Sequence, residues 1–346
     1  NKIGETIMKK LLKLLAIFLL FSSIISSSAM ASSTRTITDM TGEKIKIPKK
    51  VNRVADLWHA NNQVVLLLGG QNKLVATTPL VKKQHWFTMV DPKIAKVAAP
   101  LAGNQIQVEE LVKIKPDVVI ASDQAQIKES RQAKLPTVNA MYTDFAGLKK
   151  SVTLTAEILG GNSPKIARQY NKELTNNINL VKQHLKSRKS TPTVLHIVNA
   201  TDLTKVDGQK TIVNEWIKIA GGKNAISKKG NQISVTPEEL IKANPDVIIV
   251  GSASTAQARK ALRANSQLSQ LKAVRENKVY GNPQGTFPWD RYSAEEALQV
   301  LWAAKTLHPQ EMKNINMVSE VQKFYQKYYH YNLTVKQAKQ ILAGEN

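Results

Sequence analysis

The chain has 346 residues, no cysteine and a formal net charge of +23 at pH 7. Without cysteine it forms no disulfide, has no cysteine nucleophile and offers no cysteine for an N-terminal lipid anchor. Its lysines are scattered rather than gathered on a basic helix or an Arg-rich stripe, so the charge does not predict nucleic-acid binding.

The first 31 residues have the pattern of a secretory signal peptide. The basic pair Lys9 and Lys10 precedes an apolar run at 14–21, and a serine-rich stretch then leads to Ala31. Such a run is too short to span a membrane. We expect cleavage after Ala31, with residues 1–7 lying upstream of the true start. Export without a lipid-anchor cysteine predicts a periplasmic location.

Short strands and helices alternate in the first part of the exported chain. The pattern predicts a buried strand at 53–57 and a helix at 61–68, which Gly69 and Gly70 end in a left-handed turn. A further strand is expected at 73–77. Strands and helices that alternate in this way are typical of parallel sheets with right-handed crossovers.

A unit of thirteen residues occurs twice, at 108–120 and at 237–249, with a constant offset of 129 residues. Each copy has two glutamates near its start, then a Pro-Asp turn, then a run of β-branched residues. Acidic residues favour the N-terminus of a helix, proline ends one, and a β-branched run predicts a buried strand. A predicted strand at 193–198 and helix at 211–220 precede the second copy, as their counterparts precede the first.

Two helices are predicted between the repeats. The first covers residues 145–159, and the second extends to about residue 187. Ser163 is expected to cap this second helix, with Pro164 in its first turn. A helix of about 25 residues is about 37 Å long, enough to connect two lobes as one stiff tether. We therefore expect the lobes to close by only a small movement.

These elements predict an α/β fold of two Rossmann-like lobes with parallel sheets, joined by one long backbone helix, with a ligand cleft between the lobes. The N-terminal lobe is expected at 32–146, the connecting helical region at 147–189 and the C-terminal lobe at 190–346. Amphipathic helices predicted at 293–307 and 317–329 end the second lobe.

The paired Glu-Glu-Leu and Pro-Asp units, the signal peptide and the long helix together resemble the helical-backbone class (class III) of periplasmic substrate-binding proteins. Residues 288–295 are similar to a branch that carries iron or other metal complexes. The resemblance implies a monomeric carrier, not an enzyme. It also implies an ABC permease in the inner membrane as partner and a small metal chelate as ligand.

Within that resemblance, Glu109 and Glu238 match the carboxylates that dock each lobe onto arginines of the permease. The alternative for these glutamates is that they only complement helix dipoles. The ligand most expected is an iron–siderophore complex; haem, cobalamin and a nickel or cobalt chelate remain open. No intrinsic cofactor is predicted.

Candidate ligand residues lie where the predicted strands end, because sites in open α/β sheets form beyond the carboxyl ends of the strands. Tryptophan and tyrosine there can stack on a ring-bearing ligand, and arginine can bind an anionic one. These expected loop residues are Trp58, His59, His85, Trp86, Tyr142, Trp289, Arg291 and Tyr292.

Histidine is the candidate for direct contact with the metal. No His-x-His or similar pattern predicts a cage built entirely by the protein. We therefore expect His85, or less favourably His59, to complete the coordination of a metal that arrives in its own chelator. His196 is expected to be structural.

Enzyme activity has no support in the sequence, which lacks a Gly-x-Ser-x-Gly elbow and a phosphate-binding glycine loop. A secreted enzyme or an adhesion protein on the same fold stays open as the other class of function.

Overall fold

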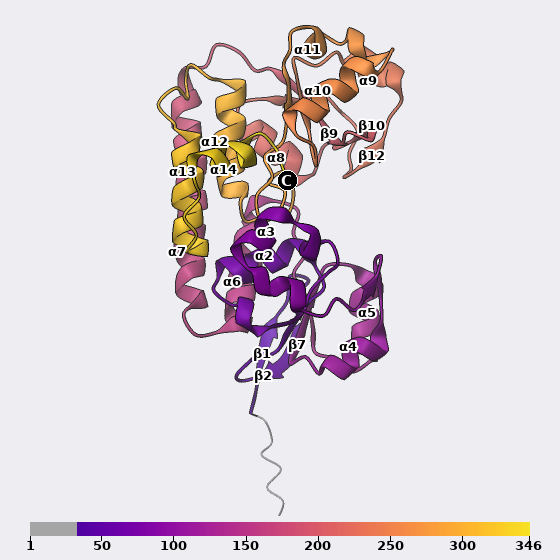
Figure 1. Ribbon diagram of the computed structural model, residues 1–346, viewed down its shortest axis with the longest axis vertical. Helices are drawn as coiled ribbons and strands as arrows, with labels where there is room; N and C mark the ends of the chain where they lie inside the picture. Colours follow the sequence, from indigo (N-terminus) through magenta and orange to yellow (C-terminus); the bar gives the residue numbers. More distant parts are fainter. Residues whose placement is uncertain (1–32) are drawn as a thin grey trace, which may run out of the picture.

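The computed structural model describes residues 33–346 and has two α/β lobes, one above the other, beside a helical spine (Figure 1). The predicted signal peptide lies outside the described residues. Within residues 33–346, no helix is both long enough and apolar enough to cross a membrane.

The N-terminal lobe contains a four-stranded parallel sheet in the order β4-β3-β7-β8. Its strands are β3 (Val54–Asp56), β4 (Leu74–Ala76), β7 (Val118–Ala121) and β8 (Thr137–Asn139). Its helices are α2 (His59–Leu67), α3 (His85–Val90), α4 (Val108–Ile114) and α5 (Gln124–Gln132). Two antiparallel pairs, β1 (Thr34–Thr38) with β2 (Lys44–Pro48) and β5 (Leu101–Ala102) with β6 (Gln105–Ile106), accompany the sheet.

The C-terminal lobe has a mixed sheet in the order β12-β10-β9-β13-β14, with β11 also beside β9. Its strands are β9 (Thr193–Asn199), β10 (Asp202–Val206), β11 (Lys223–Asn224), β12 (Ile233–Ser234), β13 (Val247–Val250) and β14 (Val279–Gly281). Its peripheral helices are α8 (Ile212–Ile219), α9 (Pro237–Ala243), α10 (Thr255–Ala264) and α11 (Lys272–Arg275).

Strands β11, β9, β13 and β14 are parallel, while β10 is antiparallel to both of its neighbours, β9 and β12. A tight turn causes this difference from the expected all-parallel lobe. The Asn199 side chain accepts hydrogen bonds from the backbone N–H groups of Thr201 and Asp202, at 3.0 and 2.9 Å, and so reverses the chain directly after β9.

The sequence repeat folds into the same unit in both lobes, α4 with β7 and α9 with β13. Each helix ends at a residue in the left-handed conformation, Lys115 with φ 53° and Asn244 with φ 36°. The order of buried and exposed positions from residue 111 to 120 is the same as from 240 to 249. The duplication therefore extends to packing.

The aspartate of each Pro-Asp turn holds the start of the lobe's first parallel strand. Asp117 accepts hydrogen bonds from the backbone N–H groups of Asn52 and Arg53, at 2.7 and 2.9 Å. Asp246 accepts the equivalent bond from the N–H of Thr193 at 2.8 Å. This shared role accounts for the repeated aspartate.

The spine consists of α6 (Phe145–Leu159) and α7 (Ser163–His184), and α7 runs beside both lobes (Figure 1). A short 3-10 turn, Leu185–Ser187, continues α7 to the predicted end. Ser163 is not the N-cap as expected: that position belongs to Asn162. The Ser163 side chain is buried and donates to the carbonyl of Leu68 at 2.9 Å, which fastens the spine to α2.

Three helices end the chain: α12 (Glu296–Leu307), α13 (Met317–Phe324), which a π turn at Tyr325–Tyr329 extends, and α14 (Val335–Leu342). Helix α12 packs on α7 of the spine, α13 packs on α12, and α14 packs on α13. The predicted helix from residue 293 begins only at Glu296, and α12 is buried on nearly all sides instead of amphipathic. A single hydrophobic core runs through the spine and the inner parts of both lobes, and each lobe has a smaller core of its own.

Candidate ligand-binding cavity

A cavity of about 960 Å³ lies between the lobes. Trp58, His59 and Lys83 line it from the N-terminal lobe, and Phe287, Arg291 and Tyr292 line it from the C-terminal lobe. Trp58 and His59 follow β3, and residues 287–292 follow β14, so the cavity lies beyond the carboxyl ends of the strands. Sequence reasoning had predicted four of these six residues.

Three aromatic rings meet across the boundary between the lobes. The ring centroids of Trp58, Tyr142 and Tyr292 lie 5.5 to 5.7 Å apart, in tilted and edge-on arrangements. Asp56 accepts a hydrogen bond from the Trp58 backbone N–H at 3.2 Å and so fixes the start of α2. Trp58 is only 4 % exposed, and Tyr142 is equally buried and lines a different groove. The cluster therefore forms a wall and leaves only part of its surface for stacking.

His59 is the first residue of α2 and lines the cavity. Its ring stacks on Phe287 of the other lobe, with 5.5 Å between centroids and 29° between planes. Burial lowers the pKa of His59 below its ordinary value of 6.5. The imidazole is thus neutral at neutral pH, which is the form that can bind a metal.

Arg291 belongs to a buried group of four charged side chains on the C-terminal lobe. Its guanidinium donates to Asp207 at 2.5 and 3.3 Å and to Asn231 at 3.1 Å. His196 lies between Asp207 and Asp290, at 2.8 and 2.9 Å from their carboxylates. These contacts fix the guanidinium at the wall of the cavity.

The pKa values of this group shift in the direction that keeps it charged. Burial alone would lower the pKa of His196, but its hydrogen bonds and charge contacts with the two aspartates raise the pKa above 6.5. Burial would raise the pKa of Asp207 and Asp290, but His196 and Arg291 hold both below 3.8. Two positive and two negative charges then balance when His196 is protonated.

Four predicted residues do not line the cavity: Tyr142, His85, Trp86 and Trp289. His85 and Trp86, expected in a loop, lie at the start of the helix α3, which follows a short 3-10 turn at Val81–Lys83. Trp86 lies in α3, is 2 % exposed and donates its indole N–H to the carbonyl of Glu345 at 2.8 Å. His85 is exposed beside it, with 4.8 Å between the two ring centroids. Trp289 is fully buried and donates to the carboxylate of Glu295.

Further cavity residues come from positions that sequence reasoning did not select. They are polar, and most stand at turns or at the starts of helices: Gln84, Asn104, Asp123, Gln126, Asn231, Gln232 and Asn346. Asp123 and Gln126 follow β7, so the strand-end rule could have found them. Asn346 is 55 residues from Arg291 in sequence, and no local pattern predicts its place.

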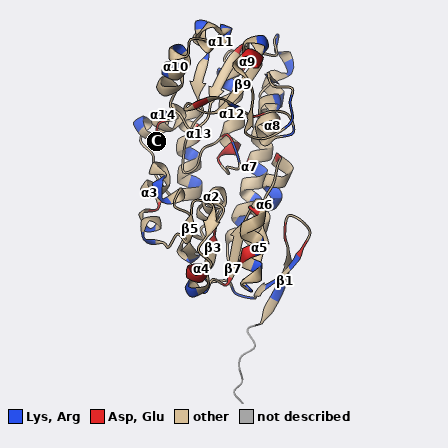
Figure 2. Cartoon of the chain, turned by 90° about the vertical axis from the view of Figure 1, so that its right-hand side faces the viewer, with Lys and Arg blue, Asp and Glu red and all other residues tan. Residues whose placement is uncertain are grey.

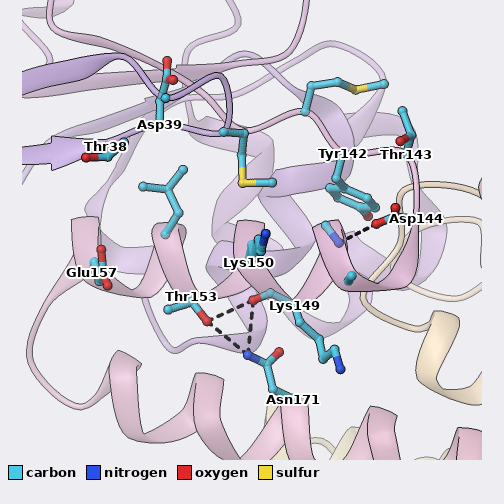
Figure 3. A pocket seen from close by; sticks show the side chains of 16 residues that line it. Thr38, Asp39, Tyr142, Thr143, Asp144, Lys149, Lys150, Thr153, Glu157 and Asn171 are labelled. Atoms are coloured by element: carbon cyan, nitrogen blue, oxygen red, sulfur yellow. Dashed lines mark hydrogen bonds between the residues drawn. The ribbon is translucent and has the colours of Figure 1, made fainter.

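A second groove, of about 790 Å³, lies where the tip of the β1–β2 hairpin meets α6 (Figure 3). Its polar groups cap the surrounding helices or join them to one another. Asp144 caps α6 by accepting from the N–H of Gly147 at 2.6 Å, and Asn171 of α7 donates to Thr153 of α6 at 3.1 Å. Residues 33–346 contain no group of three or more His, Asp or Glu side chains arranged to hold a metal ion.

Glu109 and Glu238 are exposed on α4 and α9, which lie toward opposite ends of the molecule (Figure 2). Three residues further along each helix stands an exposed aliphatic residue, Val112 at 43 % and Ile241 at 44 % exposure. The neighbouring Glu239 has partners within its own lobe: its side chain completes a capping box with Thr236 and pairs with Lys228.

Known proteins resemble this chain along nearly its full described length. It is 29 % identical to the molybdate-binding protein MolA of Haemophilus influenzae, over 92 % of this chain and 96 % of MolA. It is 28 % identical to the high-affinity heme uptake system protein IsdE of Staphylococcus aureus, over 78 % of this chain and 89 % of IsdE.

A solved structure and a family model also match this chain. A solved periplasmic solute-binding protein from Veillonella parvula superposes with a TM-score of 0.78 and 27 % identity, over 90 % of this chain and 97 % of that one. The relatives are substrate-binding proteins rather than enzymes. Residues 54–285 match the periplasmic binding protein family. The chain therefore belongs to that family, in its class III branch, as the substrate-binding component of an ABC importer.

Proposed function

We propose that this protein captures a metal chelate, most readily an iron–siderophore complex, in the cavity between its lobes and delivers it to a permease in the inner membrane. The observation that carries the proposal is the size and lining of the cavity. Its volume of about 960 Å³ matches pockets that enclose ligands much larger than a bare oxyanion or metal ion. Its wall combines aromatic rings, a fixed guanidinium and a neutral imidazole.

Each part of the wall has a chemical task in this proposal. The exposed edges of Trp58 and Tyr292 contact the rings of the chelator. Asp207 holds the Arg291 guanidinium in a fixed orientation. The other side of this guanidinium binds a negatively charged complex. His59 takes the role first expected of His85 and fills an open position on the chelated metal.

Haem is the second candidate, and one observation favours it. His59 is neutral and stands beside Phe287, so it suits an axial ligand of a flat, apolar macrocycle. The relative IsdE belongs to a heme uptake system. A nickel or cobalt chelate would use the same imidazole. All three ligands share the feature that the proposal requires, a metal held in an organic chelator.

Native mass spectrometry with metal analysis of the protein purified from its own periplasm tests the ligand class. We expect a metal together with an organic chelator in one complex. Titration of ligand-free protein with an iron(III)–catecholate complex and with haemin then separates the two leading candidates. Protein that contains no metal and binds neither probe would contradict the proposal.

Replacement of His59 tests the metal contact. We expect His59→Ala to weaken binding of the chelate at least about tenfold and to shift its absorption bands, because a ligand of the metal is lost. His85→Ala is the matched control, since His85 is exposed outside the cavity. Equal effects of the two substitutions, or none from His59→Ala, would exclude His59 as the ligand.

Glu109 and Glu238 are proposed to dock the two lobes onto the permease. Their repeated position, their exposure and the neighbouring Val112 and Ile241 support this role. Dipole complementation alone requires an acidic residue on each helix but does not require an exposed aliphatic residue beside it.

A further inference from the structure

We propose that residues 344–346 form a clasp that joins the two lobes and closes the ligand cavity, with Asn346 as part of its wall. The clasp itself rests only on contacts within the chain. Its effect on a bound chelate rests also on the proposed function. Figures 1 and 2 both place the C-terminal end at the junction of the lobes, next to α3.

The clasp is seated firmly on the C-terminal lobe. The side chain of Gln284 donates to the carbonyl of Gly344 at 2.8 Å, and the N–H of Thr255 donates to the carbonyl of Ala343 at 3.0 Å. Gly344 has φ +72°, and a Cβ there would lie 2.6 Å from the carbonyl oxygen of Ala253 and 2.7 Å from that of Asn282. Only glycine fits this position.

The same segment is bound to the N-terminal lobe one residue later. Trp86 donates its indole N–H to the carbonyl of Glu345 at 2.8 Å. The backbone N–H of His85 donates to the side-chain oxygen of Asn346 at 3.1 Å, and the Asn346 amide donates to Gln84 at 3.4 Å. The clasp thus passes from one lobe to the other within three residues.

Both sides of the clasp contribute to the cavity. Lys83 and Gln84 line it from the N-terminal lobe, and Asn346 lines it from the clasp. A movement that separates the lobes here must break the bonds to Trp86, His85 and Gln84. These are a few hydrogen bonds near the surface, so they can break and form again without unfolding of either lobe.

The clasp gives Trp86 a task that differs from ligand stacking. The ring is buried and its N–H is used within the protein, so it anchors the clasp. Trp86→Phe keeps an aromatic ring and removes this donor. Removal of residues 345–346 eliminates the clasp without changing either lobe. Trp302→Phe in α12 is the matched control, since it makes the same substitution at a buried tryptophan that lies outside the clasp.

The chain contains no cysteine, so pairs of spin labels can be attached at chosen sites. Lys128→Cys on α5 and Lys260→Cys on α10 are exposed positions on opposite lobes. In the ligand-free protein, we expect truncation and Trp86→Phe to broaden the distance distribution between the labels toward longer distances. Trp302→Phe is expected to leave it unchanged. Circular dichroism verifies that each variant is folded.

With an iron(III)–catecholate complex or haemin as probe, the truncated protein is expected to release the probe about tenfold faster than the full chain. An unchanged distance distribution in both clasp variants would overturn the proposal. So would a broadened distribution with unchanged release of a bound probe. If the full chain binds neither probe, the proposed function fails, while the spin labels still decide whether the clasp holds the lobes together.

Discussion

At the scale of single residues, the buried group of Arg291, Asp207, His196 and Asp290 has a high desolvation cost. Moving charges out of water is unfavourable, and the group is stable only because every charge has an opposite partner within hydrogen-bonding distance. Loss of one member leaves the rest of the group with an uncompensated buried charge. The group therefore fixes Arg291 at the cavity wall, and it also makes stability depend on pH.

Raising the pH is expected to weaken the protein through His196. Its pKa is raised above 6.5 in the folded state, so its contribution to stability is complete below pH 6.5 and is lost as the pH rises through the folded pKa. Asp207 and Asp290 have lowered pKa values, and their contribution is lost only in acid, as the pH falls below 3.8. Urea unfolding at several pH values measures the first effect.

Replacement of His196 is the direct test of that dependence. We expect His196→Ala to lower the free energy of unfolding by about 3 kcal/mol or more, because two buried aspartates lose a partner. The loss of stability above neutral pH should then become smaller than in the unchanged protein. A free energy of unfolding in the unchanged protein that stays constant from about pH 6 to pH 9 would contradict the proposed charge on His196.

At the scale of elements, local sequence patterns predicted a helix or strand correctly where adjacent residues determine its first and last residue. α6 has the predicted bounds, Phe145–Leu159, because Asp144 caps its start and Gly160 follows its end. α3 was missed, because His85–Val90 has no helical periodicity of its own. Its buried Trp86 is held by Glu345, 259 residues away in sequence. Contacts of that kind leave no local signal.

The repeated unit predicts equal roles for two aspartates. Asp117→Ala and Asp246→Ala each remove an acceptor from the backbone at the start of a parallel strand, and each is expected to cost about 1–3 kcal/mol of stability. Chemical denaturation measures both. Glu276→Ala, an exposed residue outside the repeat, is the control and should change stability little. A large cost in one lobe alone would contradict the shared role.

At the scale of the whole molecule, strand order predicted where the site lies but not which aromatic residues face it. Trp58, His59, Arg291 and Tyr292 reach the cavity because they follow strands. Trp86 is buried with its indole N–H on Glu345, 259 residues away, and Trp289 is buried with its indole N–H on Glu295 in the turn before α12. Tertiary packing decides such cases, since a large ring in a loop gains more from burial than from exposure.

The lobes are also joined more closely than the single predicted tether required. The Gln63 amide of α2 donates to Thr286 at 2.9 Å and accepts from the N–H of Ala294 at 2.7 Å, both in the C-terminal lobe. Together with the spine and the shared core, this contact agrees with the expectation of a small closing movement, which solution scattering with and without ligand would measure.

The two ends of the molecule are expected to bind one partner that offers the same site twice. Val112 and Ile241 occupy equivalent repeat positions with nearly equal exposure, and each stands beside an exposed glutamate on a chain that is otherwise strongly basic. A second copy of this chain would bring like charges together, which disfavours self-association. A dimeric permease with a basic and apolar patch on each half avoids that repulsion.

Two double substitutions test this docking, measured as affinity for the permease in lipid nanodiscs and as uptake. Glu109→Lys with Glu238→Lys is expected to weaken docking at least about a hundredfold, and Val112→Ser with Ile241→Ser about tenfold, because charged and apolar contacts near the centre of an interface contribute most. The matched control is Val335→Ser, at an aliphatic residue of α14 that is similarly exposed but lies outside the repeat and outside the cavity. Ligand affinity should be unchanged in all three. Equal docking by the control and the Val112–Ile241 variant would leave the glutamates as the sole contacts, and normal uptake by the charge-reversed variant would exclude docking through these two helices.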